Sequence, residues 1–329
     1  MARSVLICTI LAALYPCCPA WGLELTPFAV RNLSPPVLTH SLTVPEPARL
    51  SQAGQLVMRL GFELASNASI NDSGGEVIVL DGETYVTTLG MRYGLPRRLQ
   101  VGFDLPYIKH SGGHLDGFIE GWHDFFDLPN GDRDRLPDDE LTNAYADGSG
   151  KGFSIDDNRG RIGDLSAMLA WQWLADQQLA ASLHATVKAP TGDAEDLTGS
   201  GGWDLSLALS AQRDFVLERG DVSLWGGLGI SWLGSGDLLD DRAENWVASG
   251  WLGSGWSPFD WLGFKLQLNT HTALYDSELR ELGDPAAILT MGGSLGFGAA
   301  TTLDIGVGED LAVNASPDVT FHLLLAHRF

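Results

Sequence analysis

Polar and apolar side chains alternate with a period of two along most of this chain, and no other feature of the sequence constrains the fold as strongly. The clearest segment is LAASLHATVKA, residues 179–189. Ser182, His184, Thr186 and Lys188 occupy its even positions, and apolar side chains occupy the odd ones. An α-helix would spread these polar groups around its circumference, whereas a β-strand places all of them on one side. The segment is therefore predicted to be a strand with one polar and one apolar face.

The same alternation recurs in enough segments to predict twelve strands. Residues 246–256 are a weak case because Gly and Trp occur on both faces, and residues 76–93 are long enough for a strand to bend within them. Counts of ten and of fourteen strands therefore stay open. The predicted strands cover residues 56–64, 85–93, 99–107, 165–173, 179–189, 203–212, 222–232, 246–256, 261–269, 287–297, 302–308 and 319–329.

A soluble β-sandwich and a membrane β-barrel both show such alternation, but the composition of the two faces favours the barrel. The predicted polar face mixes charged side chains with many Gly and Ser residues, which suits a confined, wet interior better than a face open to bulk water. Aromatic residues gather near the predicted strand ends, where a membrane barrel carries its interfacial girdles. These residues are Tyr85, Tyr93, Tyr107, Trp171, Trp173, Trp203, Trp232, Trp246, Trp256, Trp261, Phe297 and Phe329.

The lengths of the predicted connections decide between the two folds. Long connections alternate with short turns, as in an even-numbered barrel with long loops outside the cell and short turns in the periplasm. We therefore predict an all-β fold, a transmembrane antiparallel β-barrel over residues 51–329. The long connections are residues 66–75, 110–162, 191–202, 234–244, 275–285 and 309–317, and the short ones are 94–97, 175–177, 214–220, 258–260 and 298–300.

The two ends of the chain fit this prediction. Residues 1–22 have the pattern of a secretory signal peptide and contain all three cysteines, so the mature chain is expected to have no disulfide. Residues 23–50 are rich in proline and lack alternation. They are expected to form either a periplasmic lead-in, which we favour, or a segment inside the lumen. The terminal Phe329 resembles the aromatic signal by which outer-membrane proteins are recognised for assembly.

The longest predicted loop, residues 110–162, contains a helical pattern. Apolar residues three or four apart predict a short amphipathic helix over residues 113–128. Its apolar face is expected either in the barrel mouth, which we favour, or on the outer leaflet. His110, His114 and His123 are zinc candidates only in principle, because glycines between the first two leave their geometry unfixed.

An acidic run follows the predicted helix and is a weak candidate for a Ca²⁺ site, since hard cations need several carboxylates within reach. The spacing is not that of an EF-hand loop, and Arg133 and Arg135 lie among the acids and can neutralise them. A solvated loop with local salt bridges is the favoured interpretation. The Ca²⁺ candidates are Asp132, Asp134, Asp138, Asp139 and Glu140.

One long stretch resembles a known family. Residues 91–139, MRYGLPRRLQVGFDLPYIKHSGGHLDGFIEGWHDFFDLPNGDRDRLPDD, together with LDGETY at 80–85 and FAVRNLSPP at 28–36, resemble the DUF3187 family of bacterial proteins. The resemblance covers most of the chain after residue 22. It implies the general architecture of an outer-membrane barrel, and it brings no catalytic residue to carry over.

The predicted barrel points to a channel. A net charge of −22 argues against a nucleic-acid partner, which needs clustered Lys and Arg. Twelve strands enclose a wider lumen than the filled eight-stranded barrels, yet a narrower one than a general porin. We therefore predict an outer-membrane channel for diffusion of a small solute, surrounded by lipid and lipopolysaccharide, with no cofactor. The predicted lumen-lining residues are Arg59, Glu63, Arg92, Asp104, His184, Lys188, Asp204, Lys265, His271, Asp304, His322 and Arg328.

Two other functions stay open. Lumen charges of both signs could form salt bridges that close the pore, leaving a structural barrel or one that binds lipopolysaccharide through divalent ions. An outer-membrane lipid hydrolase would need an activated Ser, a His and an orienting carboxylate or amide. His327 is on the predicted lipid face with no Ser near it in sequence, and GGSLG at 292–296 lacks the context of a nucleophile elbow. We therefore predict no enzymatic activity.

Overall fold

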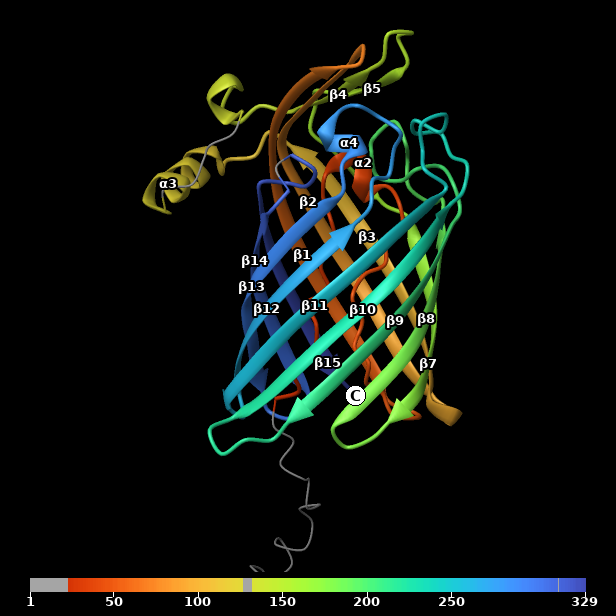
Figure 1. Cartoon of the computed structure of the whole chain (residues 1–329), viewed down its shortest axis with the longest axis vertical. Helices are drawn as coiled ribbons and strands as arrows, with labels where there is room; N and C mark the ends of the chain where they lie inside the picture. Colours follow the sequence, from red (N-terminus) through yellow and green to blue (C-terminus); the bar gives the residue numbers. More distant parts are fainter. Residues whose placement is uncertain (1–22, 127–131, 313) are drawn as a thin grey trace, which may run out of the picture.

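Twelve antiparallel strands close into a barrel (Figure 1), as the sequence predicts. The computed structural model describes residues 23–126, 132–312 and 314–329, so the expected signal peptide lies outside the described residues. Closure is complete because the last strand pairs with the first over ten residue pairs. The barrel strands are β1 (Leu56–Ser73), β2 (Glu76–Leu95), β3 (Leu99–Ser111), β7 (Leu165–Ala175), β8 (Leu179–Ala189), β9 (Asp204–Phe215), β10 (Asp221–Leu233), β11 (Trp246–Phe259), β12 (Leu262–His271), β13 (Ala286–Phe297), β14 (Thr301–Asp310) and β15 (Val319–Arg328).

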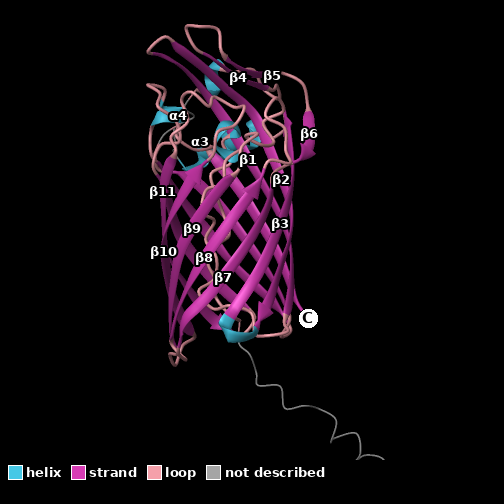
Figure 2. Cartoon of the chain, turned by 90° about the vertical axis from the view of Figure 1, so that its right-hand side faces the viewer, coloured by secondary structure: helices cyan, strands magenta, loops and turns pink. Residues whose placement is uncertain are grey.

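The barrel has two unlike ends (Figure 2). Short connections lie at one end, which we call the turn end, and they include the single-turn helix η1 (Pro96–Arg98). The long connections lie at the other, the loop end. There the expected loop at residues 66–75 is wrong, because β1 and β2 continue as a paired hairpin and only Gly74 and Gly75 turn. Both glycines have the positive φ, 61° and 81°, that a two-residue hairpin turn requires.

The segment between β3 and β7 carries several short elements at the loop end. Strand β4 (Thr142–Ala146) pairs with the upper part of β2, β5 (Gly152–Ile155) pairs with β4, and β6 (Arg159–Ile162) pairs with β3. These pairings give the extended hairpin a third and a fourth strand. The short helices of the loop end are η2 (Arg133–Arg135) and α4 (Arg280–Gly283).

Helix α3 (Asp116–Phe126) confirms the amphipathic helix expected over residues 113–128, but it does not lie in the barrel mouth. Figure 1 shows it projecting from the side of the loop end. The ring of Phe118 lies 6.4 Å from that of Phe321 on β15, while Ile119 is fully buried. The favoured expectation is wrong because other apolar side chains already fill the mouth. Among the described helices, none is both long and apolar enough to cross a membrane.

The outward face of the barrel is apolar. Leu228 and Leu252 have 70% and 68% of their surface exposed, and the other strands carry exposed leucines or other large apolar side chains on the same outward face. The girdle aromatics of the sequence prediction are on this face or at its rims, and Trp203 and Trp246 are among the most exposed. Trp225 and Trp251, which the girdle prediction did not include, are buried inside instead. Glycines make room for these two inward rings, since a Cβ at Gly227 would come within 2.0 Å of Trp251.

Residues 23–50, which we call the plug, lie inside the lumen and not below it (Figure 2). The plug enters at the turn end, where Leu23 N donates to Asp260 O, and rises to the loop end, where helix α2 (Pro35–Leu38) turns the chain. It then returns to the turn end, where Ser51 N donates to Gln100. The sequence favoured a periplasmic lead-in because the plug has no strand pattern. Inside the lumen no pattern is needed, because inward side chains of the barrel bind its backbone.

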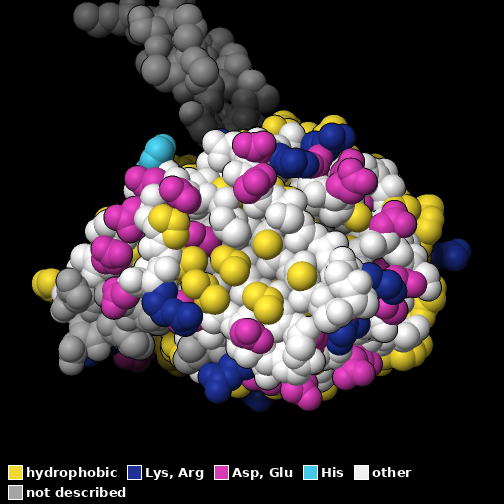
Figure 3. Space-filling model, turned by 90° about the horizontal axis from the view of Figure 1, so that it is seen from above, with side chains coloured by type: hydrophobic (Ala, Val, Ile, Leu, Met, Phe, Trp, Pro, Cys, Tyr) yellow, Lys and Arg dark blue, Asp and Glu magenta, His cyan; other side chains and the backbone are white. Residues whose placement is uncertain are grey.

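The mouth at the loop end is closed by an apolar core that the plug shares with the long connections. Figure 3 shows hydrophobic side chains at the centre of this face, surrounded by charged ones. Burial of such a cluster stabilises the fold at roughly 25 cal/mol per Å² of apolar surface. The buried members of the core are Val37, Leu42, Ile78, Leu80, Leu141, Tyr145, Ile155, Leu197, Leu233, Leu238, Leu239, Val247, Leu274, Tyr275, Leu279 and Leu282.

Candidate functional site: the occupied lumen

The twelve side chains predicted to line the lumen all point into it, and most of them meet the plug. This placement follows from the period-two alternation, which fixes the face of every strand residue once one face is known. The sequence left a lumen position for residues 23–50 open but favoured a periplasmic lead-in, and in the structure the plug occupies the space between these side chains. Of the twelve, nine are buried and Arg59, Asp104 and Arg328 are half-buried.

One ion cluster joins the plug to two barrel strands. Glu46 of the plug accepts from Arg59 Nη1 on β1 at 2.9 Å and from Arg92 Nη2 on β2. Arg92 Nη2 also donates to Asp104 Oδ2 on β3, at 2.7 Å. We call these four residues the Glu46 cluster. All four charges are satisfied within it, so Glu46 links the plug to β1 and β2, and Arg92 extends the cluster to β3.

A second charged group, the Lys188 group, lies closer to the loop end. Lys188 Nζ lies 2.6 Å from Asp164 Oδ2 and 3.1 Å from Asp204 Oδ2, and it donates to the plug carbonyl of Thr39 at 3.0 Å. Asp204 in turn accepts from the plug amide of Ser41 at 2.8 Å. Lys188 Nζ also donates to Ser200 Oγ at 2.6 Å, and a buried ammonium with four oxygen partners is the arrangement that offsets the cost of removing it from water.

Polar side chains of β9 and β12 bind the rising half of the plug. Gln267 forms two hydrogen bonds with the Phe28 backbone, accepting from its N–H and donating to its carbonyl, each at 2.9 Å. Gln212 donates to the Leu25 carbonyl at 3.1 Å, and Lys265 Nζ donates to the Thr26 carbonyl at 3.1 Å. These side chains replace the ladder that a strand would supply, so the plug backbone is satisfied without regular structure.

At the turn end, charged pairs hold the two arms of the plug. Arg49 lies 2.7 Å from Asp214 and also donates to two carbonyls of the β7–β8 turn. Glu24 lies 3.1 Å from Arg328 of β15. His271 meets Asn32 at 3.0 Å near the loop end, and Asp304 pairs with Lys265 at 2.8 Å.

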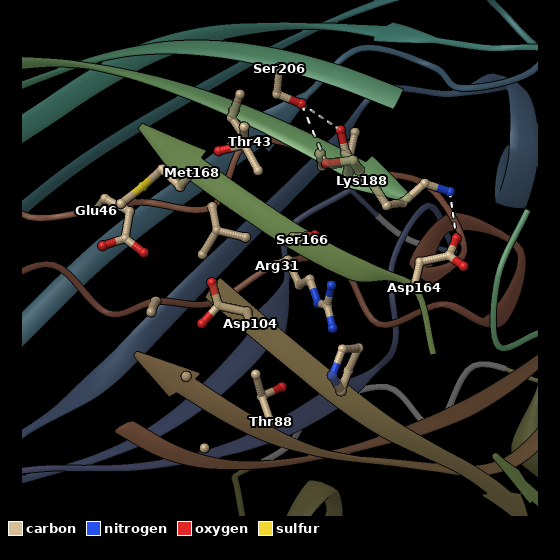
Figure 4. Close-up of a pocket in the computed structure, with 18 of the residues that line it drawn as sticks. Arg31, Thr43, Glu46, Thr88, Asp104, Asp164, Ser166, Met168, Lys188 and Ser206 are labelled. Atoms are coloured by element: carbon tan, nitrogen blue, oxygen red, sulfur yellow. Dashed lines mark hydrogen bonds and ion pairs between the residues drawn. The ribbon is translucent and has the colours of Figure 1, made fainter. Parts of the chain in front are cut away.

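Two cavities remain around the plug. The upper cavity, about 130 Å³, lies between the Glu46 cluster and the Lys188 group (Figure 4). The lower cavity, about 430 Å³, lies toward the turn end. Glu46, Arg59 and Arg92 line both, so the Glu46 cluster forms the wall between them. The lumen thus holds two cavities, one above the other, with charged residues on the walls of both.

Sequence reasoning missed the plug residues that build this site, chiefly Glu46 and Arg49. A signal was present in the plug itself. Phe28, Leu33 and Val37 are apolar residues that a solvated lead-in would expose to water, and in the structure all three are buried.

The acidic run after α3 forms ion pairs within the protein. Asp132 Oδ1 accepts from Arg135 at 2.8 Å, and the other four candidates have exposed side chains. Within the described ranges, no three His, Cys, Asp or Glu side chains are grouped as metal ligands would be. His110 is buried between Thr84 and the Leu197 carbonyl, whereas the His114 side chain is 93% exposed. The side chain of His123 lies outside the described part.

Arg133 fixes this region to the barrel rim. Its guanidinium donates to Asp116 at 2.8 Å, to Ser66 of β1 at 2.8 Å and to Asp318 at 3.0 Å. Burial raises the pKa of Asp318 to about 6, while Arg133 acts in the opposite direction and the nearby acids Asp132 and Asp116 raise it further. The long loop is thus docked through one arginine and an acid that titrates near neutral pH.

One hydroxyl–imidazole contact inside the lumen has part of the geometry of a nucleophile and its base. Ser182 Oγ lies 2.8 Å from His184 Nε2. His184 Nδ1 has no hydrogen-bond partner among the described residues, and a triad needs an orienting group there. The pair also faces the lumen and not the lipid side, so membrane lipid does not reach it.

Comparison with known proteins now places the chain. A family described as "Protein of unknown function (DUF3187)" matches residues 3–329. The chain belongs to the DUF3187 family. The stretches that suggested this family have clear places in the fold, since 28–36 lies in the rising half of the plug and 91–111 covers the end of β2, η1 and β3. No protein of curated function matches this DUF3187 chain in sequence.

Solved structures share the barrel architecture. The COG4313 outer-membrane channel from Pseudomonas putida F1 is 15% identical and has a TM-score of 0.58, covering 87% of this chain and 99% of that one. The NanC porin is 9% identical with a TM-score of 0.43, over 82% and 97% of the two chains. The translocator domain of the autotransporter NalP from Neisseria meningitidis is 11% identical with a TM-score of 0.43, over 85% and 90%. At these identities the likeness to the COG4313 channel concerns the fold.

Proposed function

We propose that this DUF3187 protein is an outer-membrane channel through which a small solute diffuses, with the plug as its constriction. The observation that carries the proposal is the pair of cavities with charged residues in their lining, separated by the Glu46 cluster. A barrel with a purely structural role gains nothing from polar cavities, because filling them with apolar side chains would stabilise it further. The outward leucines would face lipid, the loop end the cell exterior and the turn end the periplasm.

The plug explains why such a channel would be narrow. A twelve-stranded barrel is wide enough for a lumen, but the plug passes through it twice and contributes Glu46 to the wall between the cavities. Passage from one cavity to the other therefore requires the ion pairs of Glu46 to part. The fold similarity to an outer-membrane channel supports this proposal.

The test is a planar-bilayer recording of the mature chain beside a variant that lacks residues 23–50. We expect small or rare conductance steps for the mature chain and larger, sustained ones for the deletion variant, because the plug and its part of the apolar core, Val37 and Leu42, no longer fill the lumen. Glu218→Gln, in the exposed β9–β10 turn, is the matched control and should behave as the parent. If neither the mature chain nor a correctly folded deletion variant conducts above bare lipid, the channel proposal fails.

One observation favours a non-conducting barrel as the second candidate. The apolar core at the loop end covers the mouth above the upper cavity, and four of its members come from the β12–β13 connection. A barrel closed at this end could have a structural role at the cell surface and bind lipopolysaccharide through its acidic loops. The same recording separates the two. The deletion removes Val37 and Leu42 from the core and leaves its members from the long connections in place, so a barrel closed by those connections would stay silent.

A further inference from the structure

The upper cavity contains one cation and one anion that the protein leaves without hydrogen bonds. Arg31 of the plug points into it between β3 and β7 residues (Figure 4), and within the described part of the chain no hydrogen bond or ion pair involves its guanidinium. Glu63 of β1 lines the same cavity, is only 7% exposed, and accepts no hydrogen bond from the residues described. Its ion-pair contact within 4 Å is with His322 Nδ1, at 3.4 Å.

His322 does not complete the site as a hydrogen-bonding partner. It is buried with 4% of its surface exposed, and neither ring nitrogen has a hydrogen-bond partner among the described residues. Buried polar groups in native proteins are almost always paired. The buried His322 makes no hydrogen bond among the described residues, and the buried Glu63 has only its ion-pair contact with His322. Together with the half-buried guanidinium of Arg31 on the same cavity, they indicate a place for a ligand.

The other charges around the cavity are already paired. Glu46 and Asp104 bind Arg59 and Arg92, and Asp164 binds Lys188. Arg31 and Glu63 are therefore the two charges left to act on an occupant. An occupant that carried only a carboxylate would satisfy Arg31 and face Glu63 as a like charge. An occupant that carried only an ammonium group would satisfy Glu63 and face Arg31 as a like charge.

We propose that the upper cavity is a binding site for a small zwitterion of amino-acid type, with its carboxylate on Arg31 and its ammonium group on Glu63. A guanidinium suits the carboxylate because its planar fork can bind both oxygens. The carboxylate of Glu63, with His322 beside it, suits the ammonium group. A cavity of about 130 Å³ limits the solute to a small side chain. This inference rests on the proposed channel function and names the class of solute that it admits.

The test measures binding by calorimetry on the mature protein in detergent, so it does not depend on conductance. L-alanine is compared with acetate and with ethylammonium, which each carry one of its two charges. We expect alanine to bind at least about tenfold more tightly than either single-charge probe. Equal binding of acetate and alanine, or no binding of alanine to the folded protein, would overturn the proposal whatever the channel recording shows.

Variants separate the two ends of the site. Arg31→Gln should weaken alanine binding by at least about tenfold while Arg31→Lys retains part of it, and Glu63→Gln should weaken alanine binding while leaving acetate binding no weaker than in the parent. Glu218→Gln again serves as the control. If Arg31→Gln folds and still binds alanine as the parent does, Arg31 is no part of a site and the proposal is wrong. If a variant fails to fold, the three probes on the parent protein decide alone.

Discussion

At the scale of single residues, alternation along the strands carried most of the information. It placed all twelve lumen-lining side chains on the inner face, including isolated charges such as Lys265, because a strand has only two faces. It could not show what those charges bind. Lys265 pairs with Asp304 and with the plug carbonyl of Thr26, and such contacts between residues far apart in the chain leave no periodic trace.

The Glu46 carboxylate gives the sharpest test at this scale. Glu46→Gln removes the charge that Arg59 binds and leaves Arg59 in the lumen without an anion. We expect a loss of stability of about 3 kcal/mol, typical of breaking one partner of a buried pair, together with higher conductance. Equilibrium unfolding in guanidinium chloride measures the first effect and bilayer recording the second. Stability unchanged from that of the Glu218→Gln control would contradict this account of the cluster.

Two glycines on neighbouring strands give a matched pair of substitutions. A Cβ at Gly227 of β10 would lie 2.0 Å from the buried Trp251 ring, whereas one at Gly250 of β11 would meet Leu228 at 3.4 Å and Thr270 at 3.6 Å. Gly227→Ala should therefore cost about 1–3 kcal/mol through overpacking, and Gly250→Ala should change stability little. The midpoints of chemical unfolding give both values. Similar losses in the two variants would mean that Trp251 can move away freely.

At the scale of elements, the sequence located the strands and helix α3 but misjudged three placements. The hairpin above the barrel escaped notice because residues 66–73 are polar on both faces. They are strand because β2 pairs with them, and β4, which the chain brings in from beyond residue 140, pairs with the other edge of β2. The plug and the position of α3 depend in the same way on what else occupies the lumen and mouth. The local sequence pattern does not show which segment of the chain fills the lumen and which fills the mouth.

Docking of the long loop should depend on pH through Asp318. Its pKa is raised to about 6 in the folded protein, above the unfolded value of 3.8, so the folded state binds the proton more tightly. Stability then falls as pH rises between these two values and is lower at pH 7 than at pH 4, by at most about 3 kcal/mol. Hydrogen exchange of residues 132–146 should be slower at the acid end after correction for intrinsic rates. Asp318→Asn should reduce this dependence, and the remainder belongs to Asp81 and Asp310, whose pKa values burial raises to about 7. An equal dependence in that variant would assign all of it to other groups.

At the scale of the whole molecule, closure and the apolar outer surface are the properties that the sequence predicted best. Both follow from simple physics: a barrel without edges satisfies every backbone group, and lipid accepts only an apolar belt. The fold therefore followed from strand count and connection length. The lumen contents did not, because the same barrel could hold water, side chains or a segment of its own chain.

The outward belt can be tested by placing a charge on it. Leu228→Arg puts a cation at one of the most exposed belt positions, and we expect folding into lipid vesicles to be weakened by about 2–4 kcal/mol. The control is Val216→Arg, in the exposed turn between β9 and β10, where the charge would remain in water. Urea titration of vesicle-folded protein measures both. Equal stability of the two variants would mean that Leu228 does not face lipid.

The route of the plug has a topological consequence. Because the plug enters and leaves the lumen at the turn end, residues 23–50 form a loop inserted from one side and do not pass through the barrel from end to end. The barrel can close first and receive this loop later, and the loop can leave the lumen again without separating any two paired strands. Barrel closure and removal of the plug are therefore separate events. Neither requires the pairing of β1 with β15 to break.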